Sequence, residues 1–158
     1  MKDPRKRFMR AAIRLAYRSM HKNTGGPFGC VIVRDGKIIA RGSNSVTNHH
    51  DPTAHAEVVA IRKACKKLKT FQLDRCEMYC SCEPCPMCLG AIYWSRPAKV
   101  YYASNRKDAA AAGFDDDFIY HEILVDHSTR KIPFEKLEEK DALAVFVKWN
   151  EKPDKIHY

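Results

Sequence analysis

The sequence predicts an α/β fold with a mixed sheet. Two short apolar runs, 30–33 and 37–40, flank Asp35-Gly36, a dipeptide typical of tight antiparallel hairpins. Two further extended runs, 77–81 and 100–103, stand on either side of a helical stretch. A crossover of that kind favours parallel pairing of the strands that it joins. The sheet is therefore expected to contain both antiparallel and parallel neighbours.

Helices are predicted where apolar residues recur at helical spacing between turn residues. We expect them over residues 5–21, 53–68, 84–95, 105–112 and 139–151. Asp51-Pro52 and Glu83-Pro84 are expected to begin the second and third, because proline is favoured at the first helical position. The buried stripe expected on the second helix is Val58, Ile61, Cys65 and Leu68. The polar run 43–50 is expected to be a loop. The acidic run 114–118 is expected to be a solvated turn, and the alternative is a cluster of acceptors that faces a substrate.

Length and composition predict one soluble domain in a reducing compartment. With 158 residues, 45% of them apolar, the chain can build a core of its own. Its seven cysteines are an odd number, which fits a secreted disulfide framework poorly and favours the cytoplasm. The sequence shows neither the apolar run of a signal peptide nor that of a membrane span.

The net charge of +9 would suit an anionic partner such as RNA, but its distribution favours a simpler interpretation. Arginines recur at helical spacing opposite an apolar stripe, as on a solvated helix face: Arg7, Arg10, Arg14 and Arg18. Basic residues also gather over 62–69, where they suit the C-terminal dipole of the second helix. Nucleic acid is therefore the less favoured partner.

Two motifs together predict a catalytic zinc site. The run 52–57 contains His-x-Glu, and the run 81–88 contains Pro-Cys-x-x-Cys. A catalytic Zn²⁺ takes three imidazole or thiolate ligands and keeps a fourth position open for water. His55, Cys85 and Cys88 supply that set, which predicts one Zn²⁺ per chain. Glu57 is too close to His55 to be a comfortable fourth ligand and is the candidate acid/base.

A closed structural zinc site is the main alternative for the same region. Cys80 and Cys82 lie just upstream of Cys85 and Cys88, and four close cysteines can hold zinc with no open position. A structural site has no use for His-x-Glu on a separate helix, however, and that combination is the signature of zinc deaminases of nucleobases. The catalytic interpretation is therefore favoured.

Further segments join the zinc motifs in a resemblance that runs nearly from end to end. They are Gly-Gly-Pro-Phe-Gly at 25–29, Ala-Gly-Phe-Asp-Asp at 112–116, Phe-Ile-Tyr at 118–120 and the terminal tyrosine. With them the chain resembles the cytidine-deaminase superfamily, and within it the bacterial guanine deaminases. The resemblance implies a three-layer α/β/α sandwich with a five-stranded mixed sheet, and a single zinc-dependent deaminase domain over 1–158.

The resemblance also implies roles for individual residues. His55, Cys85 and Cys88 match the metal ligands, and Glu57 matches the proton shuttle. Five residues are then expected to bind the base: Phe28, Asn44, Trp94, Asp116 and Tyr158. Apart from the resemblance, the backbone N–H of Ala56, at the N-terminus of the second helix, is expected to hold the polar edge of the substrate. In this family the C-terminal segment is exchanged between the subunits of a homodimer. The matching segment here is about 130–158, so Tyr158 is expected to close the partner's site.

The reaction that follows is hydrolytic deamination of guanine to xanthine and ammonia. A tRNA adenosine deaminase is the closest alternative, because it shares the zinc motifs and would use the +9 charge on a phosphate backbone. Guanosine or a cytosine compound as substrate is a further enzymatic alternative. The alternative from another class is a non-catalytic zinc module that binds nucleic acid through its basic helices.

Overall fold

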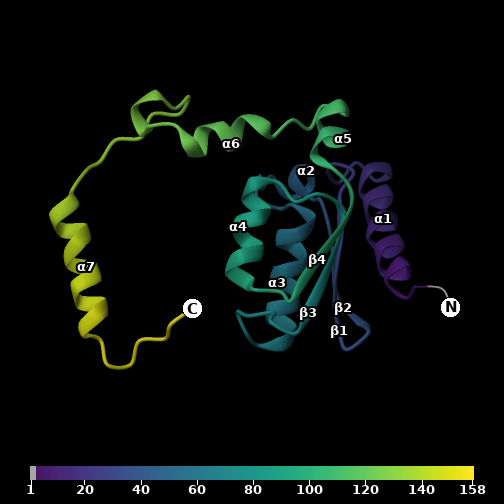
Figure 1. The fold of residues 1–158 in the computed structure, drawn as a ribbon, viewed down its shortest axis with the longest axis horizontal. Helices are drawn as coiled ribbons and strands as arrows, with labels where there is room; N and C mark the ends of the chain where they lie inside the picture. The colour runs from purple at the N-terminus through teal and green to yellow at the C-terminus, as the bar shows by residue number, and fades with distance from the viewer. Residues whose placement is uncertain (1–2) are drawn as a thin grey trace. The chain divides into compact units, whose positions relative to one another are not determined.

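A four-stranded sheet lies at the centre of residues 3–117 in the computed structural model, which describes residues 3–158 (Figure 1). The strand order is β2-β1-β3-β4. β1 (Gly29–Arg34) pairs antiparallel with β2 (Lys37–Ser43) and with β3 (Cys76–Cys82). β3 pairs parallel with β4 (Lys99–Ser104). The predicted hairpin and the predicted parallel pair are therefore confirmed.

The expectation of five strands is wrong, because residues 3–158 contribute four strands to the sheet. After β4 the regular elements are α5 (Arg106–Ala111), α6 (Asp117–Leu124), the 3₁₀ helix η1 (His127–Thr129) and α7 (Glu139–Glu151). Asn105 and Asp108 form a capping box at the start of α5, and both α6 and α7 begin with acidic residues. These local signals favour helix over strand. The predicted turn at 114–118 accordingly runs into α6.

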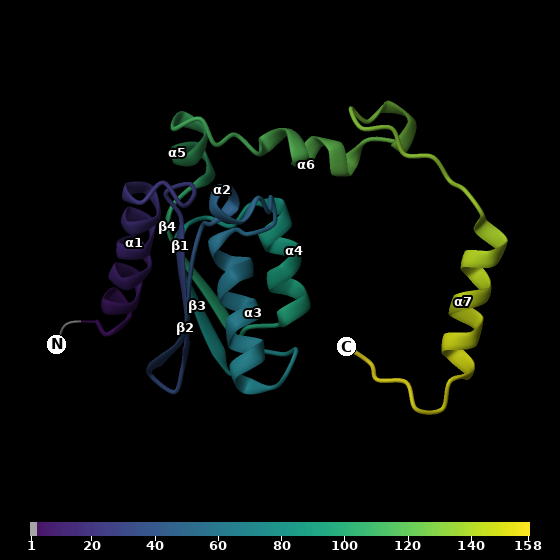
Figure 2. The same cartoon turned by 180° about the vertical axis from the view of Figure 1, so that it is seen from behind.

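Helices cover both faces of the sheet, which gives the three expected layers. α1 (Arg5–His21) lies on one face, and α3 (Ala56–Leu68) and α4 (Pro86–Ser95) lie on the other (Figures 1 and 2). β1 contributes to both cores because its side chains alternate. Val31 and Val33 pack with residues of α1, whereas Cys30 and Ile32 pack with residues of α3.

α3 packs on the sheet through small residues. Its buried side chains are Ala56, Glu57, Ala60 and Ala64, while three residues of the predicted stripe, Ile61, Cys65 and Leu68, are only partly buried. The observed stripe is rotated from the predicted one because α3 lies very close to β2. A Cβ on Gly42 would stand 2.0 Å from the carbonyl oxygen of Ala56. Glycine at this position therefore lets the first turn of α3 lie against the strand.

The helices that follow the proline signals begin later than predicted. α3 begins at Ala56 with His55 as its N-cap, and α4 begins at Pro86 with Cys85 as its N-cap. Pro86, and not Pro84, therefore occupies the first helical position. The run 43–50 is not entirely loop, since it contains the short helix α2 (Val46–His49).

Residues 118–158 form a second unit with most of α6, η1, α7 and an irregular tail. The predicted final helix over 139–151 is confirmed with the same bounds. Several large apolar side chains of this unit are at least 65% exposed: Leu124, Leu137, Val145, Phe146 and Ile156. None of the helices described between residues 3 and 158 has the length and apolar character that a membrane crossing requires.

Candidate active site

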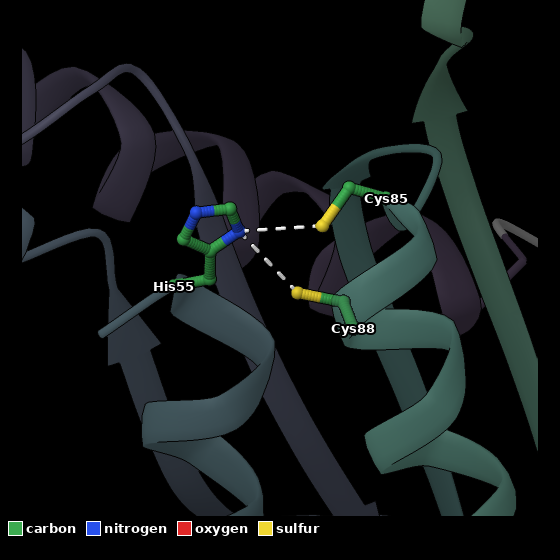
Figure 3. Close-up of side chains that lie close together, drawn as sticks. All are labelled: His55, Cys85 and Cys88. Carbon is green, nitrogen blue, oxygen red and sulfur yellow. Dashed lines mark hydrogen bonds between the residues drawn. The ribbon is translucent and has the colours of Figure 1, made fainter. Parts of the chain in front are cut away.

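Two helix N-termini on the same face of the sheet bring the three predicted metal ligands together. His55 caps α3, Cys85 caps α4, and Cys88 lies in the first turn of α4. α3 and α4 pack against each other, and Figure 3 shows the three side chains pointing toward one another. Helix N-termini carry partial positive charge from their unpaired N–H groups, and this charge favours thiolate over thiol.

The spacing of the three side chains fits a tetrahedral metal. His55 Nδ1 lies 3.4 Å from Cys85 Sγ and 3.5 Å from Cys88 Sγ. Zinc bonds of about 2.1 Å to nitrogen and 2.3 Å to sulfur, at tetrahedral angles, place such atoms about 3.6 Å apart. Within residues 3–158, this is the one group of three or more potential ligands that lie so close together. The donor set and its geometry therefore fit zinc.

The alternative of a four-cysteine site is not supported by the positions of the upstream cysteines. Cys80 Sγ lies 3.8 Å from Cys30 Sγ in the core between β1 and β3. Cys82 Sγ donates a hydrogen bond to the carbonyl oxygen of Asn105 at 3.6 Å. Neither thiol belongs to the ligand group.

Each of the two ligand cysteines shifts the pKa of the other. A hydrogen bond with Cys88, together with the one with His55, lowers the pKa of Cys85 below its ordinary value. The same bond with Cys85 and burial raise the pKa of Cys88. The hydrogen bond with Cys85 also raises the pKa of His55. A thiolate is therefore already favoured at Cys85, as metal ligation requires.

Glu57 is buried beside the ligand group. It lies in the first turn of α3 and is 7% exposed, and its Oε2 accepts a hydrogen bond from Cys88 Sγ at 3.5 Å. Burial raises the pKa of its carboxyl group. A carboxyl group with a raised pKa can both accept and donate a proton closer to neutral pH. The position suits the predicted acid/base.

Asn44 is held with one end of its side chain available for a ligand. The residue is 5% exposed, and its Oδ1 accepts hydrogen bonds from the N–H groups of Gly26 at 3.1 Å and Val46 at 3.3 Å. Its Nδ2 makes no hydrogen bond within residues 3–158. The backbone of Asn44 also donates to the carbonyl oxygen of Phe28 at 3.0 Å, which joins two of the predicted substrate residues. A third, Ala56, is the first residue of α3, and its N–H has no acceptor within the helix.

Asp116 interacts with the ligand group through its charge. Burial and then the charge of Cys85 raise the pKa of Asp116, and Asp116 in turn contributes to the raised pKa of His55. Trp94 lies in the last turn of α4, about 9 Å along the helix from Cys88, and is 63% exposed. Tyr158 belongs to the second unit. The roles of all six residues predicted to bind the substrate remain predictions.

Two residues without a predicted role shape this region, Gly25 and Phe114. Phe114 packs edge-on against Phe28, with ring centroids 5.0 Å apart. A Cβ on Gly25 would lie 2.2 Å from Asn44 Oδ1, so glycine is needed there for the amide to keep its place. The sequence indicates these two residues only weakly. Phe114 is an aromatic residue beside an acidic run, and Gly25 belongs to a glycine pair in a turn.

The fold, the ligand group and the buried carboxyl beside it define a zinc-dependent deaminase. The chain belongs to the cytidine and deoxycytidylate deaminase family, and the model of that family's zinc-binding region matches residues 2–104. Within this class the chain is 55% identical over 151 residues to the guanine deaminase of Bacillus subtilis (strain 168). That match covers 96% of this chain and 97% of the relative.

Solved structures agree with this relationship. The crystal structure of the Bacillus subtilis guanine deaminase matches with a TM-score of 0.94 and 54% identity, over 97% of this chain and 98% of that one. A guanine deaminase from Nitrosomonas europaea matches with a TM-score of 0.66 and 34% identity, over 69% of this chain and 63% of that one. The tRNA-specific adenosine deaminase of Aquifex aeolicus (strain VF5) is 44% identical over 100 residues, which are 63% of this chain and 66% of the relative.

Proposed function

We propose that this chain is a guanine deaminase, which hydrolyses guanine to xanthine and ammonia with zinc as its cofactor. The observation that carries the proposal is the extent of the similarity. The match to the Bacillus subtilis guanine deaminase takes in 96% of the chain and so includes the region beyond the zinc-binding segment that ends at residue 104. The match to a tRNA-specific adenosine deaminase takes in 63%.

Glu57 moves the protons of this reaction. His55, Cys85 and Cys88 would hold zinc, which would act as a Lewis acid and lower the pKa of a bound water molecule. Glu57 takes a proton from the attacking water as its oxygen adds to C2 of guanine, and delivers that proton to the adjacent ring nitrogen. It then carries a second proton from the added oxygen to the amino group, which leaves as ammonia. The raised pKa of Glu57 supports both directions of transfer.

The neighbouring residues hold the base in place. Phe28, backed by the edge of Phe114, offers an aromatic surface for the ring. The free Nδ2 of Asn44 and the N–H of Ala56 donate to acceptors on the base, and Asp116 accepts from a ring N–H. A base that lacks the matching groups leaves these buried groups unpaired, at a cost of about 1–3 kcal/mol for each. Trp94 lines the pocket in this proposal.

The second unit completes the site in a homodimer. In this proposal the segment of about 130–158 is exchanged between two copies, and Tyr158 closes the site of the partner. The exposed apolar side chains of residues 118–158 support the exchange, because a surface of this kind marks an interaction site. We place the enzyme in the cytoplasm, since all seven cysteines are free thiols.

A substrate panel tests the proposal. The zinc-loaded protein is incubated with guanine, guanosine, adenine, cytidine and a tRNA anticodon stem, and release of ammonia is measured for each. Guanine is expected to lose its amino group, with xanthine as the product. Ammonia from the tRNA stem and none from guanine would replace guanine deamination with tRNA editing.

Light scattering tests the second unit. The full chain is expected to be a dimer, and removal of Tyr158 is expected to lower guanine turnover while the protein remains dimeric. A monomer with full activity would rule out the exchange.

A further inference from the structure

A basic groove lies between α1 and the edge strand β2, with a volume of about 620 Å³. Five cationic side chains line it: Arg7, Arg14 and Arg18 from α1, and Lys37 and Arg41 from β2. Phe8, Ala11, Leu15 and Ile38 contribute its apolar lining. Volumes of about 300–1,000 Å³ are typical of ligand sites. Among the residues that the structure describes, no carboxylate lines this groove.

The groove is separate from the zinc site. It lies on the face of the sheet that α1 covers, whereas α3 and α4, which carry the metal ligands, cover the opposite face (Figures 1 and 2). None of the residues that line the groove belongs to the ligand group.

The cations of the groove are not neutralised by the fold. All five are exposed, and in the described part of the chain none of them forms a salt bridge. One of them, Arg7, donates a hydrogen bond at 2.8 Å to the carbonyl oxygen of Gly36, which ties α1 to the turn of the hairpin. The other four have no carboxylate beside them among the residues that line the groove.

In contrast to the cations of the groove, three basic residues of α3 interact with other parts of the chain. Lys63 and Lys67 donate to carbonyl oxygens of β2 at 3.1 and 3.4 Å, and Arg62 lies 3.8 Å from the carboxylate of Asp51. These cations contribute to the packing of α3 and to its connection. Like charges repel each other, so gathering them in one groove is unfavourable. Exposure to solvent alone therefore does not explain why the arginines of α1 converge with Lys37 and Arg41.

The arrangement of the charges indicates the ligand. Arg7 and Arg18 are eleven residues apart on α1, which separates them by about 16 Å along the helix axis. The groove thus carries a row of cations, which suits successive anionic groups better than one anion. Its one aromatic residue, Phe8, is buried at 6% exposure and cannot stack on a base. The lining therefore favours phosphates over bases.

We propose that this groove binds an oligophosphate, a chain of successive phosphate groups that is either free or carried by a nucleoside triphosphate. Guanidinium groups recognise phosphate oxygens with paired hydrogen bonds, so Arg14, Arg18 and Arg41 make the main contacts. The ion pairs relieve the repulsion between the unpaired cations.

Calorimetric titration of the full-length, zinc-loaded protein with inorganic tripolyphosphate tests this proposal. Arg14→Gln/Arg41→Gln removes two charges from the groove. Arg10→Gln/Lys66→Gln removes two charges from exposed positions outside it, so both variants go from +9 to +7. The groove variant is expected to lose about a hundredfold in affinity, about tenfold for each lost contact, and the control less than about threefold. Both variants are expected to keep the wild-type melting temperature and guanine turnover, since exposed substitutions change stability little.

The outcomes separate the ligand sources. Tripolyphosphate binding that depends on the groove supports the proposal, and tighter binding of GTP than of tripolyphosphate then assigns the site to nucleoside triphosphates. Equal losses of tripolyphosphate affinity in the two variants, or no binding of tripolyphosphate to the wild-type protein, would overturn the proposal. Binding of a single-stranded RNA through Arg14 and Arg41 without any binding of tripolyphosphate would also overturn it, in favour of a nucleic-acid surface.

Discussion

Replacing Gly42 with alanine tests whether the close approach of β2 to α3 positions the metal site. The new Cβ would lie 2.0 Å from the carbonyl oxygen of Ala56 and 2.7 Å from the nitrogen of Ala60. Contacts between carbon and oxygen in proteins are rarely closer than about 3.3 Å. The first turn of α3 must therefore move by more than about 1 Å. Such overpacking costs about 1–3 kcal/mol, which for a chain of this length lowers the melting temperature by about 2–12 °C.

The same movement displaces His55 and Glu57 from the cysteines of α4. A misplacement of about 1 Å can slow an enzyme about a hundredfold, so we expect Gly42→Ala to bind zinc more weakly and to turn over guanine about a hundredfold more slowly. Thermal melts, zinc titration and steady-state kinetics measure the three effects.

Gly90→Ala is the matched control, because it adds the same atom to α4 where nothing lies within 4 Å. It is expected to raise the melting temperature by about 2–4 °C. If Gly42→Ala kept the wild-type melting temperature, zinc affinity and turnover, the contact between β2 and α3 would have no part in positioning the metal site.

Three further substitutions test the site and its support. Glu57→Gln keeps the shape of the side chain but cannot accept a proton, so zinc content is expected to stay the same while kcat falls by about 10²–10⁴-fold, as metal analysis and kinetics will show. Asn44→Ala leaves the N–H groups of Gly26 and Val46 without their acceptor, so urea denaturation is expected to show a loss of about 1–3 kcal/mol, together with a higher KM for guanine. Hydrogen bonds from Thr53 lower the pKa of Asp51 below its ordinary value of 3.8. A carboxyl group of this kind stabilises the fold above the unfolded-state pKa and loses that contribution as the pH falls through the lowered value. The melting temperature of Asp51→Asn is therefore expected to fall less steeply below pH 3.8 than that of the wild type.

Each of these three residues would lose its proposed role under one outcome. Near-normal turnover in zinc-loaded Glu57→Gln would remove this residue from the reaction. Unchanged stability in Asn44→Ala would mean that water replaces its hydrogen bonds. Superimposable pH profiles for Asp51→Asn and the wild type would show that the turn at Asp51 contributes nothing.

Elements whose geometry is set within a few residues are predictable from the sequence. Asp35 and Gly36 have φ angles of +49° and +70°, the left-handed conformation that makes Asp-Gly a hairpin signal. α7 has the predicted bounds because its acidic start and its apolar spacing lie within one segment. The metal ligands are predictable for a different reason, since few residue types can bind zinc and the two motifs contain them at chelating spacing.

Features that depend on contacts between distant segments are not predictable in the same way. Pro52 favours a helix start at 53, but Asp51 Oδ1 accepts from the N–H and the hydroxyl of Thr53 at 2.8 and 2.7 Å, which makes a turn. Because of this turn and the contact at Gly42, α3 begins only at Ala56 and its buried face requires small residues. The edge-on contact of Phe114 with Phe28 likewise depends on the fold, because 86 residues separate the two rings along the chain.

The coordination of the bound metal decides between an open catalytic zinc site and a closed structural one. X-ray absorption at the zinc edge of the loaded protein is expected to show two sulfur atoms at about 2.3 Å and two nitrogen or oxygen atoms at about 2.0–2.1 Å. The same spectrum of Cys85→Ala is expected to lose one of the two sulfur atoms. Three or four sulfur atoms in the wild-type spectrum would mean a closed structural site, and the proposed deamination would have no place to occur.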